Sequence, residues 1–530
     1  MSKPSIAISH PTSYWLINLW ASSPTVDLIT KLPLTMPPYQ TINLHPSSHL
    51  VSGLDTDTFD VICIGSGWAG RVLASRVAAS GLKSLVIETE LIGGDCPFWA
   101  CVPSKALLRP IESLEDSRQV QGVKETVSAD RVDVGAVFAR RDKITANWDD
   151  RVALVPMVEK SGAHVVRGKG RIAGEREVIV EDLDGATRTL HARRAVAVCT
   201  GSEPIIPPIP GLSDASPWTP RQATSSSTVP KHLLIIGAGA VGCEMATAYQ
   251  SFGSEVTIVT SGPRLLHRFD PEVGELLRKS LEDKGVTIHA STEIIRVSRD
   301  TASGRIIAVL GTGDVLHADE VLVAAGRRAK TAGIGLDTYN LPTDGSPIPV
   351  NESLCVDTVP GQWLYAAGDV NGRHPLTHGS KYHGRIMANS ILGASEKAAP
   401  EPWSPIAATA DTLAQPQVIF TRPTVASVGL TRTDAERAGI SYRAITSPSM
   451  TIASRIRRDD AVDGWAQWIV EKSTNRLLGA TLVGDEVGEL IHAYTVAIVG
   501  QMTLERLAHA VPAFPTLSEV HLNLLEAAGL

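Results

Sequence analysis

The chain has 530 residues, of which 43% are apolar and 20% are charged, so it is long enough for two to four globular domains and is not a disordered or fibrous protein. Its formal net charge of −7 provides no broad basic surface, so we do not expect nucleic acid as a partner. No apolar run reaches the roughly 18 residues that cross a bilayer, and 6 cysteines are too few for a secreted disulfide framework. We therefore predict a soluble, cytoplasmic protein that does not bind membranes.

Residues 1–55 are rich in Ser, Thr and Pro and contain no Arg. This composition matches neither an Arg-rich transit peptide nor a signal peptide with a charged and then an apolar region. We predict a poorly ordered N-terminal extension here. Because Met36 lies inside it and the first strand pattern begins only at Phe59, we also keep the hypothesis that translation starts at Met36.

The first strong pattern, at residues 59–88, reads as an apolar strand, a glycine turn, an amphipathic helix and a second strand. Gly65, Gly67 and Gly70 follow the GxGxxG spacing, which allows a tight turn, a close approach to a pyrophosphate and close packing of the helix on the strand. Glu88, at the end of the second strand, can accept hydrogen bonds from a ribose hydroxyl. This complete βαβ unit predicts a dinucleotide site rather than an ordinary glycine-rich turn.

Two cysteines, Cys96 and Cys101, follow in the segment GGDCPFWACVPSKALLRP at residues 93–110. Disulfide-bonded Cα atoms lie within about 6.8 Å of each other, but five residues of regular helix advance about 7.5 Å, so a bonded pair cannot share one ideal helix. Pro97 is tolerated only in a first helical turn, which places Cys96 at a distorted helix entrance and Cys101 just inside it. Backbone N–H groups and the helix dipole favour a thiolate there.

This cysteine pair could be a structural bond, part of a metal site, two buried apolar thiols or a reversible switch. Closing so short a loop would stabilise the fold by only about 2 kcal/mol. A metal site would need two further ligands at a matching spacing, which the sequence lacks. Two buried thiols stay an alternative on this segment alone, but the nucleotide-binding patterns around it favour a reversible two-electron switch.

The glycine pattern returns at residues 232–260, with Gly237, Gly239 and Gly242 again between a strand and a helix. Two such units imply two dinucleotides. We expect a flavin in the first unit and a nicotinamide cofactor that exchanges at the second, because hydride transfer needs a donor beside a carrier.

The choice between NADH and NADPH depends on the end of the second strand in this unit. That strand ends in Thr260, where an acid would normally bind the 2′-hydroxyl of NADH. Nearby cations could meet a 2′-phosphate instead, so NADPH is preferred over NADH, although Ser261 occupies the position where an arginine would help most. These cations are Arg264, His267 and Arg268.

Over about residues 57–530, the chain resembles the class I pyridine nucleotide–disulfide oxidoreductases, the family of dihydrolipoamide dehydrogenase, glutathione reductase and mercuric reductase. The segments that carry the resemblance fall in the family's order. They are GGDCPFWACVPSK at 93–105, VCTGSEP at 198–204, AAGRRAKT at 324–331, LYAAGDV at 364–370, PQVIFTRPTVASVGLT at 416–431 and FPTLSE at 514–519.

The resemblance implies an α/β fold with two Rossmann-like dinucleotide-binding domains, for FAD and NAD(P)H, plus a C-terminal α+β dimerisation domain. It also implies a homodimer in which the partner subunit completes each site. The expected division is an extension at 1–55, the first part of the FAD domain at 56–212, the NAD(P)H domain at 213–325, the second part of the FAD domain at 326–400 and the dimerisation domain at 401–530.

The resemblance further implies a role for each matching residue. Cys101 would be the charge-transfer thiolate next to the flavin, and Cys96 the interchange thiol that meets the acceptor. Lys105 would form an ion pair with Glu244 beside the flavin N5, although either residue alone also fits a solvated helix charge. Asp369 would bind the ribityl chain of FAD, unless it is only a turn residue. Further cofactor contacts are implied for Thr200, Gly201, Gly326 and Thr377.

The chain departs from the family near its C-terminus. The family ends in His-Pro-Thr-x-x-Glu, whose His acts from the partner subunit on the interchange thiol, but this chain has Phe514 in place of that His. A positioned acid–base group contributes about 10²- to 10⁴-fold, so we expect poor turnover of lipoamide or glutathione substrates. Glu519 could itself transfer protons if burial raises its pKa, whereas a packing or surface role is expected for His521. The terminal LLEAAGL has no cysteine, so mercury reduction is not expected.

These observations predict an FAD-dependent enzyme that passes electrons from NAD(P)H through the flavin and the Cys96–Cys101 disulfide to a small acceptor. One alternative is a quinone-type flavin reductase with ancillary cysteines. Another is thioether cleavage, as in the 2-ketopropyl-coenzyme M oxidoreductase/carboxylase branch, which shares the Cys-Pro-x-x-Ala-Cys-Val-Pro segment and the Phe but has a His at the position of Glu519. A catalytically lapsed flavoprotein that serves as a scaffold is a third. The sequence does not identify the acceptor.

Overall fold

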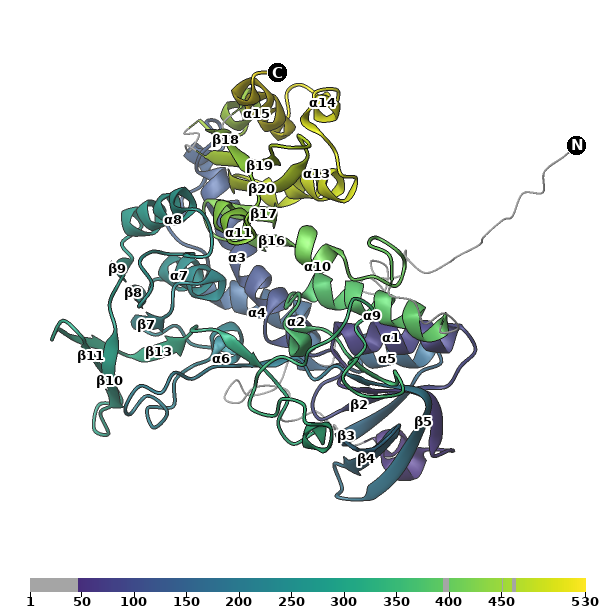
Figure 1. Cartoon of the computed structure of the whole chain (residues 1–530). Coiled ribbons are helices and arrows are strands. Elements are labelled where there is room, and N and C mark those ends of the chain that lie inside the picture. Colours follow the sequence, from purple (N-terminus) through teal and green to yellow (C-terminus); the bar gives the residue numbers. More distant parts are fainter. Residues whose placement is uncertain (1–45, 394–399, 450, 460–463) are drawn as a thin grey trace, which may run out of the picture.

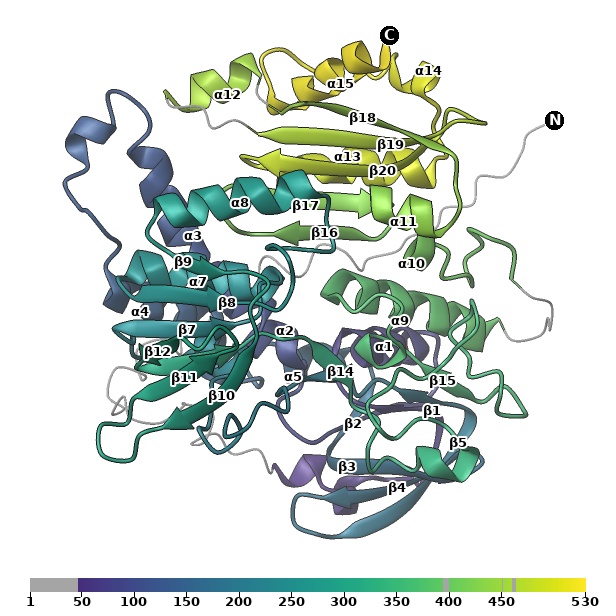
Figure 2. The same ribbon diagram turned by 60° about the vertical axis from the view of Figure 1, so that its left-hand side comes forward.

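The computed structural model describes residues 46–393, 400–449, 451–459 and 464–530. Three sheet-centred bodies meet around the middle of the molecule (Figure 1). Figure 2 shows the C-terminal sheet at the top, the sheet that contains β7 and β8 at the left, and the sheet that contains β1 and β5 below them.

The first body is a mainly parallel sheet with β1 at its centre. Strands β2 and β5 both run parallel to β1, β3 extends the sheet beyond β2 and β15 extends it beyond β5. Every residue of β1 after Thr58 is buried, which is typical of a parallel strand covered on both faces. The bounds are β1 (Thr58–Ile64), β2 (Ser84–Glu88), β3 (His164–Gly174), the antiparallel β4 (Glu177–Asp182), β5 (Thr187–Val198) and β15 (Leu364–Ala366).

The second body is a four-stranded parallel sheet in the order β13-β7-β8-β9, next to a three-stranded antiparallel sheet. Its strands are β7 (His232–Ile236), β8 (Glu255–Val259), β9 (Thr287–His289), β10 (Ile294–Arg299), β11 (Ile306–Leu310), β12 (Val315–Ala318) and β13 (Glu320–Val323). A short antiparallel pair, β6 (Ser202–Pro204) with β14 (Arg327–Ala329), connects it to the first body.

The third body is a five-stranded antiparallel sheet in the order β16-β17-β20-β19-β18. Its strands are β16 (Pro416–Ile419), β17 (Thr424–Gly429), β18 (Tyr442–Pro448), β19 (Trp465–Glu471) and β20 (Leu477–Gly484). A buried apolar cluster between this sheet and helices α13 and α15 forms its core. The predicted class, two Rossmann-like units plus a C-terminal α+β domain, is thereby confirmed, while the exact domain divisions stay a prediction.

The helices cover these sheets and join them. The helices α1 and α9 pack against each other over the first sheet in both views. The bounds are α1 (Trp68–Ala79), α2 (Asp95–Phe98), α3 (Cys101–Ser117), α4 (Val134–Ile144), α5 (Leu154–Lys160), α6 (Pro220–Ser225), α7 (Ala240–Phe252), α8 (Pro271–Asp283), α9 (Thr377–Leu392), α10 (Ala410–Leu413), α11 (Arg432–Arg437), α12 (Ile452–Arg457), α13 (Val487–Val499), α14 (Leu504–Leu507) and α15 (Val520–Ala528). Among the described helices, none is both long enough and apolar enough to cross a membrane.

The end of the expected N-terminal extension differs from the prediction. Residues 46–55 contain two short 3₁₀ turns, and Val51 and Leu54 are buried in the core of the first body. The Val51 N–H donates to Asp182 Oδ2 at 3.1 Å, and Arg188 donates to the Val51 carbonyl at 2.6 Å. These contacts fix the segment, so it is part of the folded domain. Residues 1–45, Met36 included, lie outside the described residues.

Candidate active site

The two cysteines lie at the ends of separate helices. Cys96 is in α2, the helix breaks at Ala100 with φ −132° and ψ −102°, and Cys101 is the first residue of α3. This break agrees with the sequence argument, because one regular helix would hold the sulfur atoms too far apart. The N-terminus of α3 directs its free N–H groups and its positive dipole end toward the Cys101 position, which favours a thiolate there.

Glycines bring the cysteine segment against the first glycine loop. Gly93 and Gly94 have φ values of +140° and +71°, which side chains rarely adopt. A Cβ on Gly94 would lie 3.0 Å from the Cα of Gly67. The backbone next to the cysteines therefore touches the loop expected to bind the pyrophosphate, so the dithiol and the first nucleotide unit form one site.

The two thiols are free, and their surroundings favour a negative charge on one of them. The neighbouring Cys96 thiol lowers the pKa of Cys101 to about 6, against the opposing effect of burial. Thr377 Oγ1, at 3.2 Å from Cys101 Sγ, and the charge of Lys105 act in the same direction. The nearby Cys101, together with burial, raises the pKa of Cys96. These opposite directions favour Cys101 as the thiolate of the pair and Cys96 as the protonated thiol.

We expect the thiolate of the reduced holoenzyme to titrate with a midpoint near pH 6, because the pKa of Cys101 is lowered to about 6. Replacing Lys105→Met should raise this midpoint, since it removes a cation and leaves the Glu244 carboxylate, which opposes the thiolate. The thiolate absorbance measured against pH gives the midpoint. The control is Arg109→Met, an exposed cation farther along α3 that pairs with Glu112. A wild-type midpoint near that of an ordinary thiol, about 8.5, would contradict the assignment.

Lys105 lies where the three bodies meet. Its Nζ donates to both carboxylate oxygens of Glu244 on α7, at 2.8 and 2.9 Å, and lies 4.7 Å from the ring centroid of Phe420, just after β16. Glu244, which is 5% exposed, also accepts a hydrogen bond from the Phe420 N–H at 3.0 Å. The ion pair implied by the resemblance is thus present, and its place beside a flavin stays a prediction.

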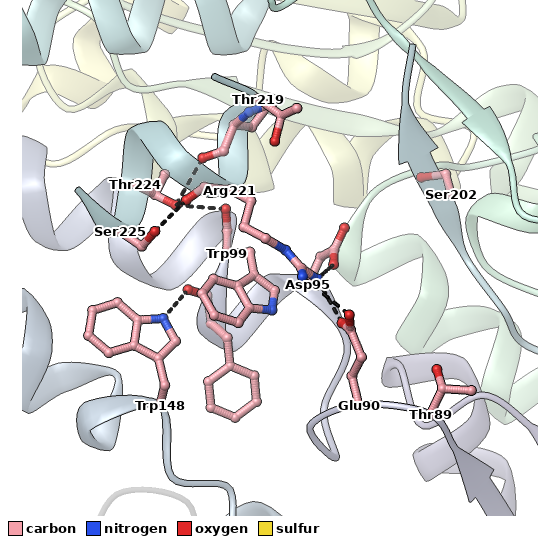
Figure 3. Close-up of polar contacts among 12 residues, drawn as sticks. Thr89, Glu90, Asp95, Trp99, Trp148, Ser202, Thr219, Arg221, Thr224 and Ser225 are labelled. Carbon is pink, nitrogen blue, oxygen red and sulfur yellow. Dashed lines mark hydrogen bonds and ion pairs between the residues drawn. The ribbon is translucent and has the colours of Figure 1, made fainter. Parts of the chain in front are cut away.

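Arg221 ties α2 to the neighbouring elements, as Figure 3 shows. Its guanidinium donates to the Glu90 carboxylate at 2.7 and 3.2 Å and lies 4.5 Å from the Trp99 ring centroid. Arg327, from β14, forms an ion pair with Asp95 at the start of α2. In the same view, Thr224 Oγ1 donates to the Trp99 carbonyl at 2.9 Å. These contacts hold both ends of α2, and with it Cys96.

The first glycine motif has the geometry of a dinucleotide cradle. A Cβ on Gly65 would lie 2.2 Å from the Cys199 carbonyl oxygen, and a Cβ on Gly70 would lie 2.1 Å from the Gly65 carbonyl oxygen. At Gly67, by contrast, the nearest atom to an added Cβ lies 4.0 Å away, and no side chain caps the helix that begins there. The free helix N-terminus and the open space beside it fit a pyrophosphate. Glu88 binds the Ser66 N–H at 2.9 Å and so fixes the loop.

A second group of expected cofactor contacts lies at the β6–β14 pair. Ser202 donates to Asp369 Oδ2 at 2.5 Å, and the Thr200 hydroxyl donates to the Lys330 carbonyl at 2.7 Å. Gly201 has φ +74° with no atom within 4 Å of an added Cβ, and Gly326 also has a positive φ, +118°. The structure therefore brings Thr200, Gly201, Gly326 and Asp369 together, although no local sequence pattern links them.

The second glycine motif repeats the first. A Cβ on Gly237 would lie 2.5 Å from the Ala324 carbonyl oxygen, a Cβ on Gly242 would lie 2.1 Å from the Gly237 carbonyl oxygen, and Gly239 faces open space. No side chain caps the N-terminus of α7. This site fits a second dinucleotide for the same reason as the first.

The cations after β8 are not equivalent. Arg264 donates to the backbone carbonyls of His267 and Phe269, at 3.3 and 3.1 Å, so part of its guanidinium is engaged in holding the loop. His267 and Arg268 are exposed. Thr260 is buried, and its hydroxyl accepts from the Gly262 N–H at 3.2 Å. Arg268 is therefore the cation with more freedom to meet a 2′-phosphate.

Phe514 and Glu519 lie in the third body, apart from the cysteines of the same chain. Figure 2 shows β16 and β17 between the C-terminal helices and α2. Phe514 is 74% exposed, and Glu519 Oε2 is buried without a hydrogen-bond partner in the described part of the chain. His521 packs inside this body, where its Nε2 bonds the Leu507 carbonyl at 2.8 Å and burial lowers its pKa.

Several side chains near the dithiol were missed by the sequence reasoning. A bulky ring inside the first GxGxxG segment, which normally carries small residues, and a charge directly after its last glycine were an available signal for two of them. Arg221 and Lys381 belong to segments whose local sequence gives no such signal. Arg327 lies in the segment AAGRRAKT. These residues are Trp68, Arg71, Arg221, Lys381 and Arg327.

Comparison with known families agrees with this geometry. Residues 59–384 match the family model described as pyridine nucleotide-disulphide oxidoreductase. Residues 415–524 match the model of the dimerisation domain of the same family. The chain is 32% identical to dihydrolipoyl dehydrogenase of Chlorobaculum tepidum over 466 residues, which are 87% of this chain and 95% of that protein. It is 27% identical to mercuric reductase of Staphylococcus aureus over 478 residues, 89% and 83% of the two chains.

Solved structures show the same fold. The HOCl-induced flavoprotein disulfide reductase RclA from Escherichia coli, solved as a Cu(II) complex, superposes with a TM-score of 0.75 at 23% identity, over 89% of this chain and 99% of that one. LpdA from Mycobacterium tuberculosis superposes with a TM-score of 0.75 at 24% identity and the same coverage.

Proposed function

The chain belongs to the pyridine nucleotide–disulphide oxidoreductase family, whose members are FAD-dependent enzymes that use NAD(P)H, and from this premise we propose that Cys96 and Cys101 carry electrons to a small acceptor. The observation that supports this most directly is the position of Cys101, which is the first residue of α3 and has Thr377 Oγ1 at 3.2 Å from its Sγ. Neither feature is needed for a structural pair of buried thiols.

Each residue of the site has a distinct task in this proposal. FAD, held by the Gly65–Gly70 turn, would supply the two-electron chemistry between the nicotinamide and the disulfide. Cys101 would carry a negative charge on the side of the dithiol that faces the flavin. Lys105 and Thr377 would stabilise this charge. Cys96, as the protonated partner, would lose its proton and attack the acceptor. The buried Glu244 would fix Lys105 in place through two hydrogen bonds.

The site favours acceptors other than lipoamide, glutathione disulfide and mercuric ion. A phenyl ring at position 514 cannot transfer protons, and no cysteine lies in the C-terminal segment LLEAAGL. Acceptors whose reduction needs an imidazole beside the interchange thiol should react slowly. We therefore propose a small acceptor that takes its protons from water or from Glu519.

We propose that the protein acts as a homodimer in the cytoplasm. The chain has a dimerisation domain, and apolar side chains on that part of the molecule are exposed in the single subunit. Exposed apolar side chains on a dimerisation domain fit a surface that a second subunit covers. These residues are Val496, Val499, Val511 and Phe514, which are 55%, 44%, 85% and 74% exposed. Six cysteines in 530 residues are few for an oxidising compartment, which favours a reducing one.

An anaerobic titration of the holoenzyme with NADPH and with NADH tests the electron path. If the dithiol takes part, each subunit should accept electrons beyond those that fill its flavin, and a long-wavelength absorbance band should mark the Cys101 thiolate beside oxidised flavin. Reduction that stops after the flavin, without this band, would contradict the proposal.

We also propose NADPH as the preferred donor, because Thr260 replaces an acid and Arg268, in the loop after β8, is exposed. A charge-assisted hydrogen bond to the 2′-phosphate is worth about a factor of ten in affinity. The substitution Arg268→Gln should therefore raise the KM for NADPH about tenfold and leave the KM for NADH unchanged. Lys279→Gln, an exposed cation on α8, is the control. Equal KM values for NADPH and NADH in the wild-type enzyme would end this proposal.

A further inference from the structure

His383, on α9, is a buried imidazole with a partner on each ring nitrogen. It is 0% exposed. Its Nδ1 accepts a hydrogen bond from the Gly368 N–H at 3.1 Å, and its Nε2 lies 2.8 and 2.9 Å from the two carboxylate oxygens of Asp411. Because an amide N–H can only donate, the ring carries one proton, on Nε2, and donates it to Asp411. The two partners therefore select one tautomer of the ring.

Asp411, on the short helix α10, is the group that maintains this tautomer. Its side chain is fully buried, and Arg373 Nε donates to it at 2.9 Å. Burial alone would raise the pKa of Asp411, but the neighbouring imidazoles and Arg373 lower it well below its usual range. An ionised carboxylate can only accept hydrogen bonds. As long as Asp411 is ionised, Nδ1 of His383 keeps its lone pair for the Gly368 N–H.

Gly368 lies directly before the carboxylate that is expected to contact FAD. Its φ is +79°, a conformation that side chains rarely adopt, and an added Cβ would lie 3.1 Å from Ser380 Oγ on α9. The next residue, Asp369, is the one expected at the ribityl chain, and Ser202 donates to its Oδ2 at 2.5 Å. A shift of the Gly368 amide would therefore move Asp369.

The hydrogen bonds of His383 also connect this turn to the third body. Helix α10, which carries Asp411, ends at Leu413, and β16 begins at Pro416. One turn earlier on α9, His378 Nε2 bonds the Pro416 carbonyl at 2.7 Å. The turn before Asp369 is thus fixed from a segment outside both glycine motifs, which is why no local pattern indicates it.

We propose that Asp411 and His383 are positioning residues for FAD. The carboxylate sets the tautomer of the imidazole, and Nδ1 of the imidazole holds the turn of Gly368 and Asp369 in the conformation that binds the cofactor. Both residues act through the backbone of Gly368. This inference rests on the cofactor site of the proposed function and not on its dithiol.

Dissociation of FAD from the full-length holoenzyme tests the hydrogen bond to Gly368. Free FAD is separated by ultrafiltration at a series of protein concentrations, which gives the Kd. His383→Leu fills the space but bonds neither partner, so it should raise the Kd at least about tenfold. In His383→Gln the amide oxygen can accept from Gly368 while the NH2 group donates to Asp411, and most of the wild-type affinity should return.

Asp411→Asn tests the tautomer itself. An amide NH2 group next to Nε2 favours the wrong tautomer, with the proton on Nδ1, where it would face the Gly368 N–H. We expect the Kd for FAD to rise about tenfold. In solid-state nitrogen-15 spectra of holoenzyme labelled at histidine Nδ1, the His383 signal should move from the unprotonated to the protonated position. This signal is identified by its absence from the spectrum of His383→Gln.

Two matched controls change the same chemical groups elsewhere. Glu352→Gln converts an exposed acid that accepts from the same Arg373, at 2.8 Å. His232→Gln replaces an imidazole that bonds Thr257 in the second body, at 2.9 Å. Both should keep the wild-type Kd for FAD.

Two results would overturn the inference. One is wild-type affinity with an unprotonated Nδ1 in Asp411→Asn. The other is a Kd in His383→Gln as high as in His383→Leu, because the shape of the ring would then matter and its hydrogen bonds would not. If His383→Leu fails to fold, Asp411→Asn provides the independent result. A holoenzyme that binds FAD as described but passes no electrons to its cysteines would contradict the proposed function alone.

Discussion

Replacing Cys96→Ser should lower turnover of the physiological acceptor by at least about 10³-fold, as the loss of an attacking nucleophile generally does. Reduction of the bound flavin by NADPH should survive, because Cys96 lies on the acceptor side of the Cys101 thiolate. The serine hydroxyl is close in volume to the thiol, so α2 and the ion pairs of its Asp95 with Arg221 and Arg327 should be retained. Steady-state turnover and stopped-flow flavin reduction, measured on the same preparation, separate the two steps.

The same variant decides between the dithiol mechanism and a quinone-type flavin reductase. In the second case the acceptor takes electrons directly from the flavin, and Cys96→Ser would keep wild-type turnover. Cys355→Ala is the control, since Cys355 is a buried thiol of the first body away from this site. If Cys355→Ala lost as much activity as Cys96→Ser, the loss would reflect general instability instead of chemistry.

The local parts of the site were predictable because short segments determine them. The two GxGxxG turns, the helix break between Cys96 and Cys101 and the thiolate position at the start of α3 all follow from backbone geometry within a few residues. The Lys105–Glu244 pair joins α3 to α7, and only the family resemblance suggested it.

The remaining features depend on contacts between distant segments. The charge of Arg71 next to the glycine turn was visible in the sequence, but its burial beside Gly93 and the ring of Trp68 that it shares with Lys381, about 300 positions away, were not. The burial of Val51 and Leu54 was missed because the Ser- and Thr-rich composition around them indicates disorder, while two apolar side chains are enough to anchor so short a segment. Side chains that act from a partner subunit cannot be located from local sequence at all.

Phe514→His should raise turnover of glutathione disulfide or lipoamide substrates by about 10²-fold, the lower end of what a positioned acid–base group contributes. The substitution restores the one element of the family's closing segment that this chain lacks, and Glu519, which would orient the imidazole, is already present with a buried carboxylate oxygen that has no partner in the described residues. Because Phe514 is 74% exposed in the subunit, its replacement should not disturb the core.

The pH profile distinguishes a restored proton shuttle from a merely widened site. The gain in kcat/KM of Phe514→His should follow a new titration near the usual imidazole pKa of about 6.5, and Phe514→Leu, which opens the same space without a titratable group, should show neither the gain nor the new limb. Equal gains in both variants would mean that the ring of Phe514 only blocks access. No gain in either would mean that position 514 does not reach the dithiol of the partner subunit, so the dimer would have to complete its site with other residues.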